Sequence, residues 1–298
     1  MIREILTNSN PMFLTGGSTS VVATCIDVPK DSAEVEFCTC DCDFTEYALW
    51  DAGTEEHKND STSVLVRRIA GTETFAFKIV KGSAVVATIT NDTYGKYWAF
   101  GSLTYGYYSG TRIDWKLVAQ AFGNGDYKIL VERTFGGNTT QAYSHVYLVR
   151  PYSPSIAKGT VKIETIQNGN YVLSETFRAM EWYQSIRLDG KLWNKQPKIE
   201  TTEYVDSGRL RNQVWDKITN TYQLEVRAVP SFIGNELVYG RMMANTIYLT
   251  DYNINYEQYR KVPMRIENIA GAKAWARSGR MAFRFELTDL SEGTIKGY

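Results

Sequence analysis

The 298-residue chain is poor in histidine, cysteine and proline, with two, four and seven of these residues, and its 33 basic side chains are balanced by 33 acidic ones. Proteins that bind nucleic acid nonspecifically usually have more basic than acidic side chains, and this chain does not. No apolar run approaches the roughly 20 residues of a membrane helix, and residues 1–8 lack the apolar region of a signal peptide. We therefore expect no membrane insertion, no specific nucleic-acid binding, and assembly in a cytosol.

Recognisable catalytic motifs are also missing from the sequence. It contains no G-x-S-x-G, H-E-x-x-H, G-x-G-x-x-G or P-loop pattern. His57 lies in a polar stretch and predicts a solvated loop, and His145 lies beside a strand start without a nucleophile motif. Paired carboxylates such as Glu55 and Glu56 occur, but a glycosidase pair also needs a cleft and a defined separation. We therefore expect no catalytic residue, no cofactor and no enzyme activity.

The four cysteines are Cys25, Cys38, Cys40 and Cys42. On a strand the last three would share one face with Phe44, and their sulfurs would lie about 7 Å apart. That separation is too large for one shared ion unless the strand bends, and zinc sites usually place two or more residues between paired cysteines. We therefore interpret these cysteines as small buried side chains in a reducing compartment, and expect no metal rather than a four-cysteine site.

Alternation of apolar and polar residues dominates what the sequence does contain. In residues 126–135, Tyr127, Ile129 and Val131 share one face. The other strand candidates are residues 75–80, 83–90, 144–150, 160–166, 198–205, 222–229, 246–250 and 281–287. Turn signals include Gly136-Gly137 and Asp189-Gly190, and the clearest hairpin is residues 163–174 around Asn168-Gly169. The pattern predicts an all-β fold of antiparallel sheets, each with one face buried and the other exposed to solvent.

Helix signals are few. Asp114 is a candidate cap for a helix over residues 115–122 that ends at Gly123, and a second candidate covers residues 231–244. The Pro- and Ser-containing residues 151–158 interrupt the strand pattern as a linker does. We predict two domains, an amino-terminal β-sandwich of residues 1–152 and a carboxy-terminal β-sandwich or barrel of residues 153–298. Residues 184–197 and 235–244 alternate poorly, which favours loops or arms buried between subunits.

Residues 94–108 form the densest aromatic segment of the chain. Aromatic side chains most often fill a core, they are also enriched where subunits meet, and aromatic faces can stack on sugars. All three interpretations stay open: domain core, inter-subunit contact and carbohydrate platform. The candidate contact residues are Tyr94, Tyr97, Trp98, Tyr105, Tyr107 and Tyr108.

Four stretches of the sequence resemble proteins from the tail-gene regions of bacteriophages. They are residues 114–127 (DWKLVAQAFGNGDY), 159–169 (GTVKIETIQNG), 182–200 (WYQSIRLDGKLWNKQPKIE) and 246–255 (TIYLTDYNIN). The resemblance extends beyond these stretches to about half of the chain, and it is to structural components of the distal-tail or baseplate kind. The resemblance implies β-sandwich or β-barrel domains joined into a ring around the tail axis. It carries no catalytic signature and assigns no site residue.

The sequence therefore favours a non-enzymatic structural subunit of a tailed-bacteriophage virion, assembled in the host cytoplasm. We expect a homo-oligomeric ring in the tail, baseplate or neck, with other phage tail, baseplate or neck proteins as partners. The alternative is a carbohydrate-binding module for receptor recognition at the tail tip, and a third possibility is a small β-fold hydrolase. A ring subunit should expose apolar patches on two opposite sides, a glycan binder coplanar rings, and an enzyme a cleft with perturbed carboxylates.

Overall fold

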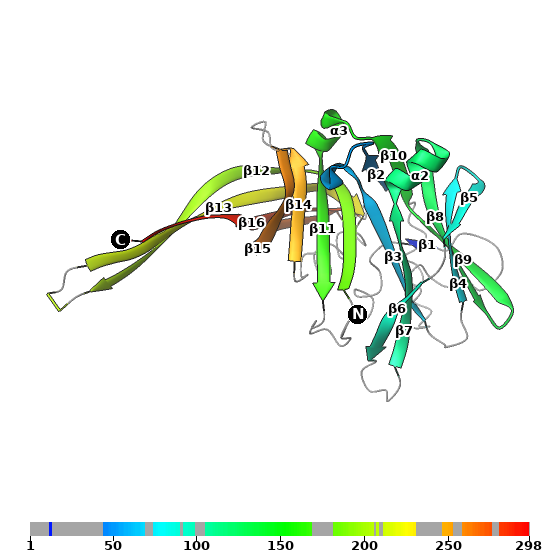
Figure 1. Ribbon diagram of the computed structural model, residues 1–298, viewed down its shortest axis with the longest axis horizontal. Helices are drawn as coiled ribbons and strands as arrows, with labels where there is room; N and C mark the ends of the chain where they lie inside the picture. Colours follow the sequence, from blue (N-terminus) through cyan, green and yellow to red (C-terminus); the bar gives the residue numbers. More distant parts are fainter. Residues whose placement is uncertain are drawn as a thin grey trace.

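The computed structural model confirms the all-β fold. It describes residues 12–13, 44–68, 74–89, 92–98, 105–168, 181–205, 207–208, 211–230, 246–252, 258–275 and 280–297. Two short α-helices lie among these residues, α2 (Trp115–Phe122) and α3 (Pro154–Gly159), together with the 3-10 helix η2 (Glu56–Lys58). All other regular secondary structure in these residues is β-strand, arranged in two sheets and one barrel (Figure 1).

The amino-terminal half contains a seven-stranded sheet with the central order β1-β9-β8-β10-β2, to which β4 and β5 attach through β8. Its pairs are antiparallel except that β10 runs parallel to β2, which departs from the expected purely antiparallel pairing. A three-stranded sheet of order β3-β7-β6 lies beside it. The strands are β1 (Met12–Phe13), β2 (Thr45–Trp50), β3 (Ser61–Arg68), β4 (Thr74–Lys81), β5 (Ala84–Ile89), β6 (Asp92–Trp98), β7 (Tyr105–Asp114), β8 (Gly125–Phe135), β9 (Asn138–Ser144) and β10 (Val146–Pro151).

Local sequence signals explain several elements of this half. Tyr127, Ile129 and Val131 are all buried on β8, as the alternation predicts. The β8–β9 hairpin turns at Gly136 and Gly137, whose φ angles of 57° and 79° are the positive values that such a turn requires. These two residues and the buried face of β8 therefore follow directly from the sequence.

Helix α2 has the predicted bounds. The Asp114 carboxylate accepts a hydrogen bond of 2.8 Å from the backbone N–H of Lys116, and Gly123 follows the last turn with a φ of 78°. Trp115 is fully buried, donates from Nε1 to Thr62 Oγ1 at 2.8 Å, and packs its ring 4.8 Å from that of Tyr147. The helix thereby fills the space between β3 and β10.

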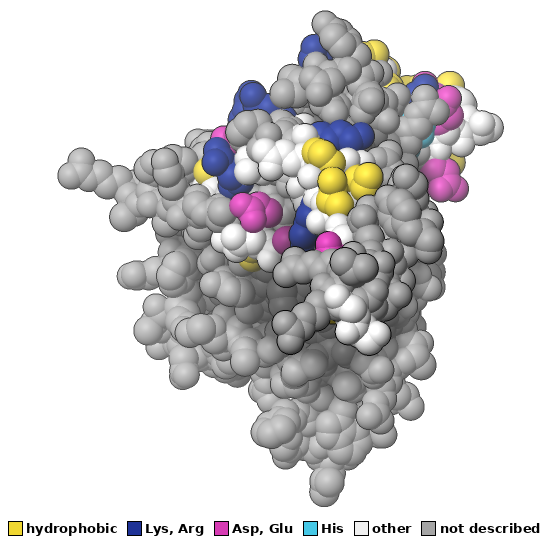
Figure 2. All heavy atoms as spheres, turned by 90° about the vertical axis from the view of Figure 1, so that its left-hand side faces the viewer, with side chains coloured by type: hydrophobic (Ala, Val, Ile, Leu, Met, Phe, Trp, Pro, Cys, Tyr) yellow, Lys and Arg dark blue, Asp and Glu magenta, His cyan; other side chains and the backbone are white. Residues whose placement is uncertain are grey.

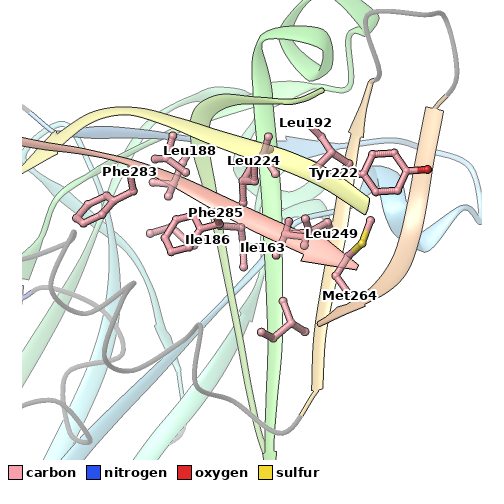
Figure 3. Close-up of a cluster of buried hydrophobic side chains, with 14 of the residues drawn as sticks. Ile163, Ile186, Leu188, Leu192, Tyr222, Leu224, Leu249, Met264, Phe283 and Phe285 are labelled. Atoms are coloured by element: carbon pink, nitrogen blue, oxygen red, sulfur yellow. The ribbon is translucent and has the colours of Figure 1, made fainter. Parts of the chain in front are cut away.

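The carboxy-terminal half is a closed antiparallel barrel of order β11-β12-β13-β16-β15-β14. Its strands are β11 (Thr160–Asn168), β12 (Glu181–Val205), β13 (Arg211–Pro230), β14 (Thr246–Tyr252), β15 (Gln258–Trp275) and β16 (Arg280–Gly297). Figure 3 shows the apolar interior, in which side chains from different strands converge. They include Ile163, Ile186, Leu188, Leu224, Leu249 and Phe285, all buried. Phe44, from the amino-terminal half, joins the same core.

Three predictions about the barrel are wrong. The tight hairpin at Asn168-Gly169 does not form, because Asn168 pairs with Glu181 instead. Asp189-Gly190 is not a turn but lies inside β12, where a Cβ on Gly190 would approach the carbonyl oxygen of Glu225 to 2.5 Å. Residues 184–197, expected as loops or arms between subunits, also lie within β12: Ser185 to Leu188 are buried in the barrel wall, while residues 195–197 are exposed as an arm would be. The glycine at position 190 therefore permits close packing of two strands instead of forming a turn.

The expected linker at residues 151–158 contains helix α3, which starts at Pro154. Residues before this helix form one hydrophobic cluster, and residues after it form another. Phe44 is the exception, because it precedes the helix in sequence but belongs to the second cluster. The division into residues 1–152 and 153–298 stays a prediction. The helix predicted over residues 231–244, the segment 235–244 and all four cysteines lie outside the described residues.

Candidate assembly surfaces and a junction pocket

A long β-ribbon projects from the barrel (Figure 1). It consists of residues 195–205 of β12, 211–221 of β13 and 293–297 of β16, and is called the arm below. Pairing runs from Gln196↔Thr221 to Val205↔Arg211, and from Trp215↔Gly297 to Thr219↔Gly293. Residues 195–199 are all exposed, which places both faces of β12 in solvent at the start of the arm, and residues 201, 203 and 205 expose one face further along it. A narrow β-ribbon is at best marginally stable by itself.

Large apolar side chains are exposed along the arm. Ile199 and Ile218 are 62% and 40% exposed, and Val205 is 60% exposed. Ile199 and Ile218 are cross-strand partners, so their side chains lie next to each other on one face. Figure 2 looks onto this end of the molecule and shows hydrophobic side chains between basic and acidic ones. Such a mixed surface is typical of a protein contact rather than of a core.

Figure 1 shows helix α2 and strand β5 at the end of the long axis away from the arm. Three large apolar side chains are exposed there: Leu117 and Phe122 on α2, which are 63% and 38% exposed, and Val85 on β5, which is 51% exposed. Leu117 and Phe122 lie five residues apart, so they point about 140° apart around the helix axis. The carbonyl of Phe122 accepts a 2.6 Å hydrogen bond from Lys81 Nζ at the end of β4, which fixes the helix end beside the β4–β5 hairpin. These three residues are called the α2–β5 patch below.

The six aromatic candidates lie on two paired strands. Tyr94, Tyr97 and Trp98 are on β6, and Tyr105, Tyr107 and Tyr108 are on β7. The register pairs Trp98 with Tyr105, and a register shift between Thr93 and Gly95 leaves Tyr94 without a partner in the ladder. The backbone therefore brings the six residues into one hairpin. Their roles as core, contact or sugar platform stay predictions.

A buried ionic network joins the two halves. Asp60 accepts two hydrogen bonds from Arg187, at 2.8 Å from Nε and 2.9 Å from Nη2, and one from the backbone N–H of Leu49. Lys162 Nζ donates to the carbonyl of Asn59 at 2.9 Å and lies 3.5 Å from Asp60. Burial raises the pKa of Asp60, but the charges of Arg187 and Lys162 outweigh it and hold the pKa below its ordinary value.

Both histidines are buried rather than solvated. His145 Nε2 lies 2.9 Å from Glu46 Oε2, and the other oxygen of Glu46 accepts the backbone N–H of Arg187 across the junction. The prediction of a solvated loop at His57 is wrong, because this side chain is 9% exposed and belongs to η2. Its Nε2 lies 3.3 Å from Glu55. Both histidines have structural carboxylate partners, and neither has an adjacent nucleophile among these contacts.

A polar pocket of about 400 Å³ opens at the same junction. Tyr183, which lines it, donates a hydrogen bond to Glu164 Oε1, and the Arg112 guanidinium lies 4.1 Å above the Tyr183 ring. Burial, followed by the charge of Glu164, raises the pKa of Tyr183 well above its ordinary value, so the phenol stays protonated. The lining residues are Gly53, Thr54, Glu56, His57, Asn59, Asp60, Ser61, Arg112, Asp114, Lys116, Lys162, Glu164, Tyr183 and Lys261.

Sequence reasoning missed the network and the pocket because they depend on a covered barrel face. In residues 160–166 the apolar side chains alternate with Lys162 and Glu164, which predicts that the two charges face solvent. Both charged side chains are instead buried, because the amino-terminal half covers that face of β11. The one sequence feature that could have indicated this burial is the opposite charge of Lys162 and Glu164, which share one face of the strand.

Within the described ranges, no group of three or more His, Cys, Asp or Glu side chains is placed to hold a metal ion. No helix of the described part is long and apolar enough to pass through a bilayer.

Comparisons with models of known protein families, with curated proteins and with solved structures find no match to this chain. The proposals below therefore depend on the geometry of this chain and on its sequence.

Proposed function

We propose that this chain is a ring-forming structural subunit of a tailed-bacteriophage virion, in the tail, the baseplate or the neck. The observation that carries the proposal is the pair of exposed apolar surfaces, the arm and the α2–β5 patch, at opposite ends of the molecule. A subunit whose two ends differ can associate head to tail, and such contacts close into a ring when the rotation per subunit allows it.

The arm supports assembly because large apolar side chains are exposed along it. A neighbouring copy that covers Ile199 and Ile218 removes apolar surface from water, at roughly 25 cal/mol per Å² of apolar area. The α2–β5 patch of that neighbour offers Leu117, its most exposed side chain, for the same contact. We propose that the arm of one subunit lies against the α2–β5 patch of the next, with other tail, baseplate or neck proteins above and below the ring.

The proposal is tested by sedimentation velocity and negative-stain electron microscopy of the purified chain, alone and with the proteins encoded beside it. The control is a chain without the arm, in which an Asn-Gly turn replaces residues 198–219 and the chain ends at residue 292. Pro197 and Asn220 are register partners, so a two-residue turn can join them. We expect closed rings from the full chain and a folded monomer from the control.

Two results together would contradict the proposal. One is a full chain that stays monomeric at every concentration, with or without its neighbours. The other is the absence of the protein from purified virions in mass spectrometry. Rings that form equally well without the arm would retain the ring function but reject the arm as its contact.

A further inference from the structure

The junction pocket has features of a small-molecule site that the proposed ring function does not use. Its volume of about 400 Å³ lies near the lower end of the range of about 300–1,000 Å³ in which proteins bind small ligands. Residues of both halves line it: Ser61 and Arg112 come from the amino-terminal half, and Glu164 and Tyr183 come from the barrel. A ligand in this pocket would therefore contact both the sheets and the barrel.

Glu164 supplies an acceptor that the protein leaves unused. The side chain is 3% exposed, and its Oε1 is engaged by Tyr183 and lies 3.3 Å from Lys162 Nζ. Its Oε2 is buried and has no hydrogen-bond partner among the described residues. Because an unsatisfied buried carboxylate oxygen costs free energy, a ligand hydroxyl or amide that displaces the atoms covering it and donates to it recovers part of that cost.

Arg112 supplies donors next to Tyr183. Its Nε donates to Ser61 Oγ at 3.0 Å, and the face of its guanidinium lies over the Tyr183 ring. An arginine carries five N–H groups, and within the described part of the chain only the one on Nε has a hydrogen-bond partner. The pocket therefore presents N–H donors as well as a carboxylate acceptor to whatever enters it.

The charges of the pocket disfavour a ligand with a net charge. Four carboxylate and four cationic side chains line it, so its formal charge is balanced. An anion that approaches Arg112 meets Glu164, and a cation that approaches Glu164 meets Lys162, each at the expense of its hydration. A hydroxyl avoids this conflict because it donates and accepts. We propose that the pocket binds one neutral, hydroxyl-rich ligand of the size of a monosaccharide.

The test is saturation-transfer NMR on the full chain with D-glucose, D-galactose, N-acetyl-D-glucosamine and L-rhamnose as probes. We expect saturable transfer to at least one sugar that neither sulfate nor choline displaces. The absence of transfer to all four sugars would overturn the proposal. Displacement by sulfate or choline would overturn it too, because the pocket would then prefer a charged ligand.

Two variants test whether the sugar binds in this pocket. Glu164→Gln keeps the shape of the side chain but replaces the unused acceptor by a donor, and should weaken binding about tenfold or more. Thr54→Trp changes an exposed residue on the rim, fills the pocket without touching the ionic network, and should abolish binding. Glu132→Gln, on β8 outside the pocket, is the matched control and should bind as the unmodified chain does.

Each outcome with the variants is decisive. If Glu164→Gln impairs folding, as circular dichroism would show, Thr54→Trp alone decides the matter. A sugar that binds the Thr54→Trp chain unchanged occupies another surface, such as the β6–β7 aromatic hairpin, and the proposal fails. The ring proposal does not depend on any of these results, because it uses neither Thr54 nor Glu164.

Discussion

Asp60 and Arg187, which lie 127 residues apart in the sequence, form a bidentate and fully buried ion pair with N–O distances of 2.8 and 2.9 Å. Asp60 ends the loop before β3, and Arg187 lies in the wall of the barrel. The pair thereby fixes the barrel to the amino-terminal sheets at one point. Because both charges are removed from water, each depends on the other for compensation.

We therefore predict that Asp60→Asn lowers the free energy of unfolding by about 3 kcal/mol, since it leaves Arg187 buried without its counter-charge. Urea denaturation followed by circular dichroism measures the change. The control is Asp126→Asn, which breaks the exposed pair with Arg150 and should cost no more than about 0.5 kcal/mol. Equal losses in the two variants would show that the buried pair contributes no more than a surface pair.

The same pair predicts a pH dependence. The pKa of Asp60 is lowered from 3.8 in the folded protein, so below that value the unfolded chain binds more protons than the folded one. The stability that Asp60 contributes is then fully present above its ordinary pKa and is lost as the pH falls through the lower folded value. The difference in unfolding free energy between the unmodified chain and Asp60→Asn should shrink as the pH falls from about 6 to about 3. A constant or growing difference would contradict this linkage.

How much was predictable from sequence depended on the range of the interaction. Helix α2 was predicted to the residue because Asp114 and Gly123 act within one turn of its ends. Alternation is local, so it predicted β4, β5, β8, β10, β11 and β14 close to their bounds and parts of β12, β13 and β16. Strands β2, β3, β6, β7, β9 and β15 were not among the candidates. The partner of Asn168, the burial of Lys162 and the approach of Gly190 to Glu225 depend on contacts between distant segments, which no local pattern records.

Gly190 provides a test of that close approach. Its replacement by alanine places a Cβ 2.5 Å from the carbonyl oxygen of Glu225, so β12 and β13 must separate locally. We predict that Gly190→Ala destabilises the protein by about 1–3 kcal/mol, the usual cost of overpacking. Gly159→Ala is the control, because a Cβ at that position would meet no atom within 4 Å, and it should be neutral or slightly stabilising. Thermal unfolding compares the two, and equal midpoints would reject the clash.

The arm and the α2–β5 patch make the sharpest prediction about assembly. Ile218→Asp changes an arm residue that is 40% exposed, so the monomer should lose no more than about 0.5 kcal/mol of stability. Leu117→Asp does the same to the patch. Each variant should fail to form rings, because a charge then replaces an apolar side chain at the contact. Ile269→Asp, at a residue 37% exposed on β15 and outside both surfaces, is the matched control and should assemble normally.

Mixing the two defective chains tests whether the arm meets the patch. The Ile218→Asp chain keeps an intact patch and the Leu117→Asp chain keeps an intact arm, so one productive contact can form between them. The remaining two ends are both defective, and growth stops. We therefore predict a one-to-one heterodimer in sedimentation velocity from two chains that are each monomeric. Rings in the mixture, or monomers alone, would mean that the arm contacts some surface other than the α2–β5 patch.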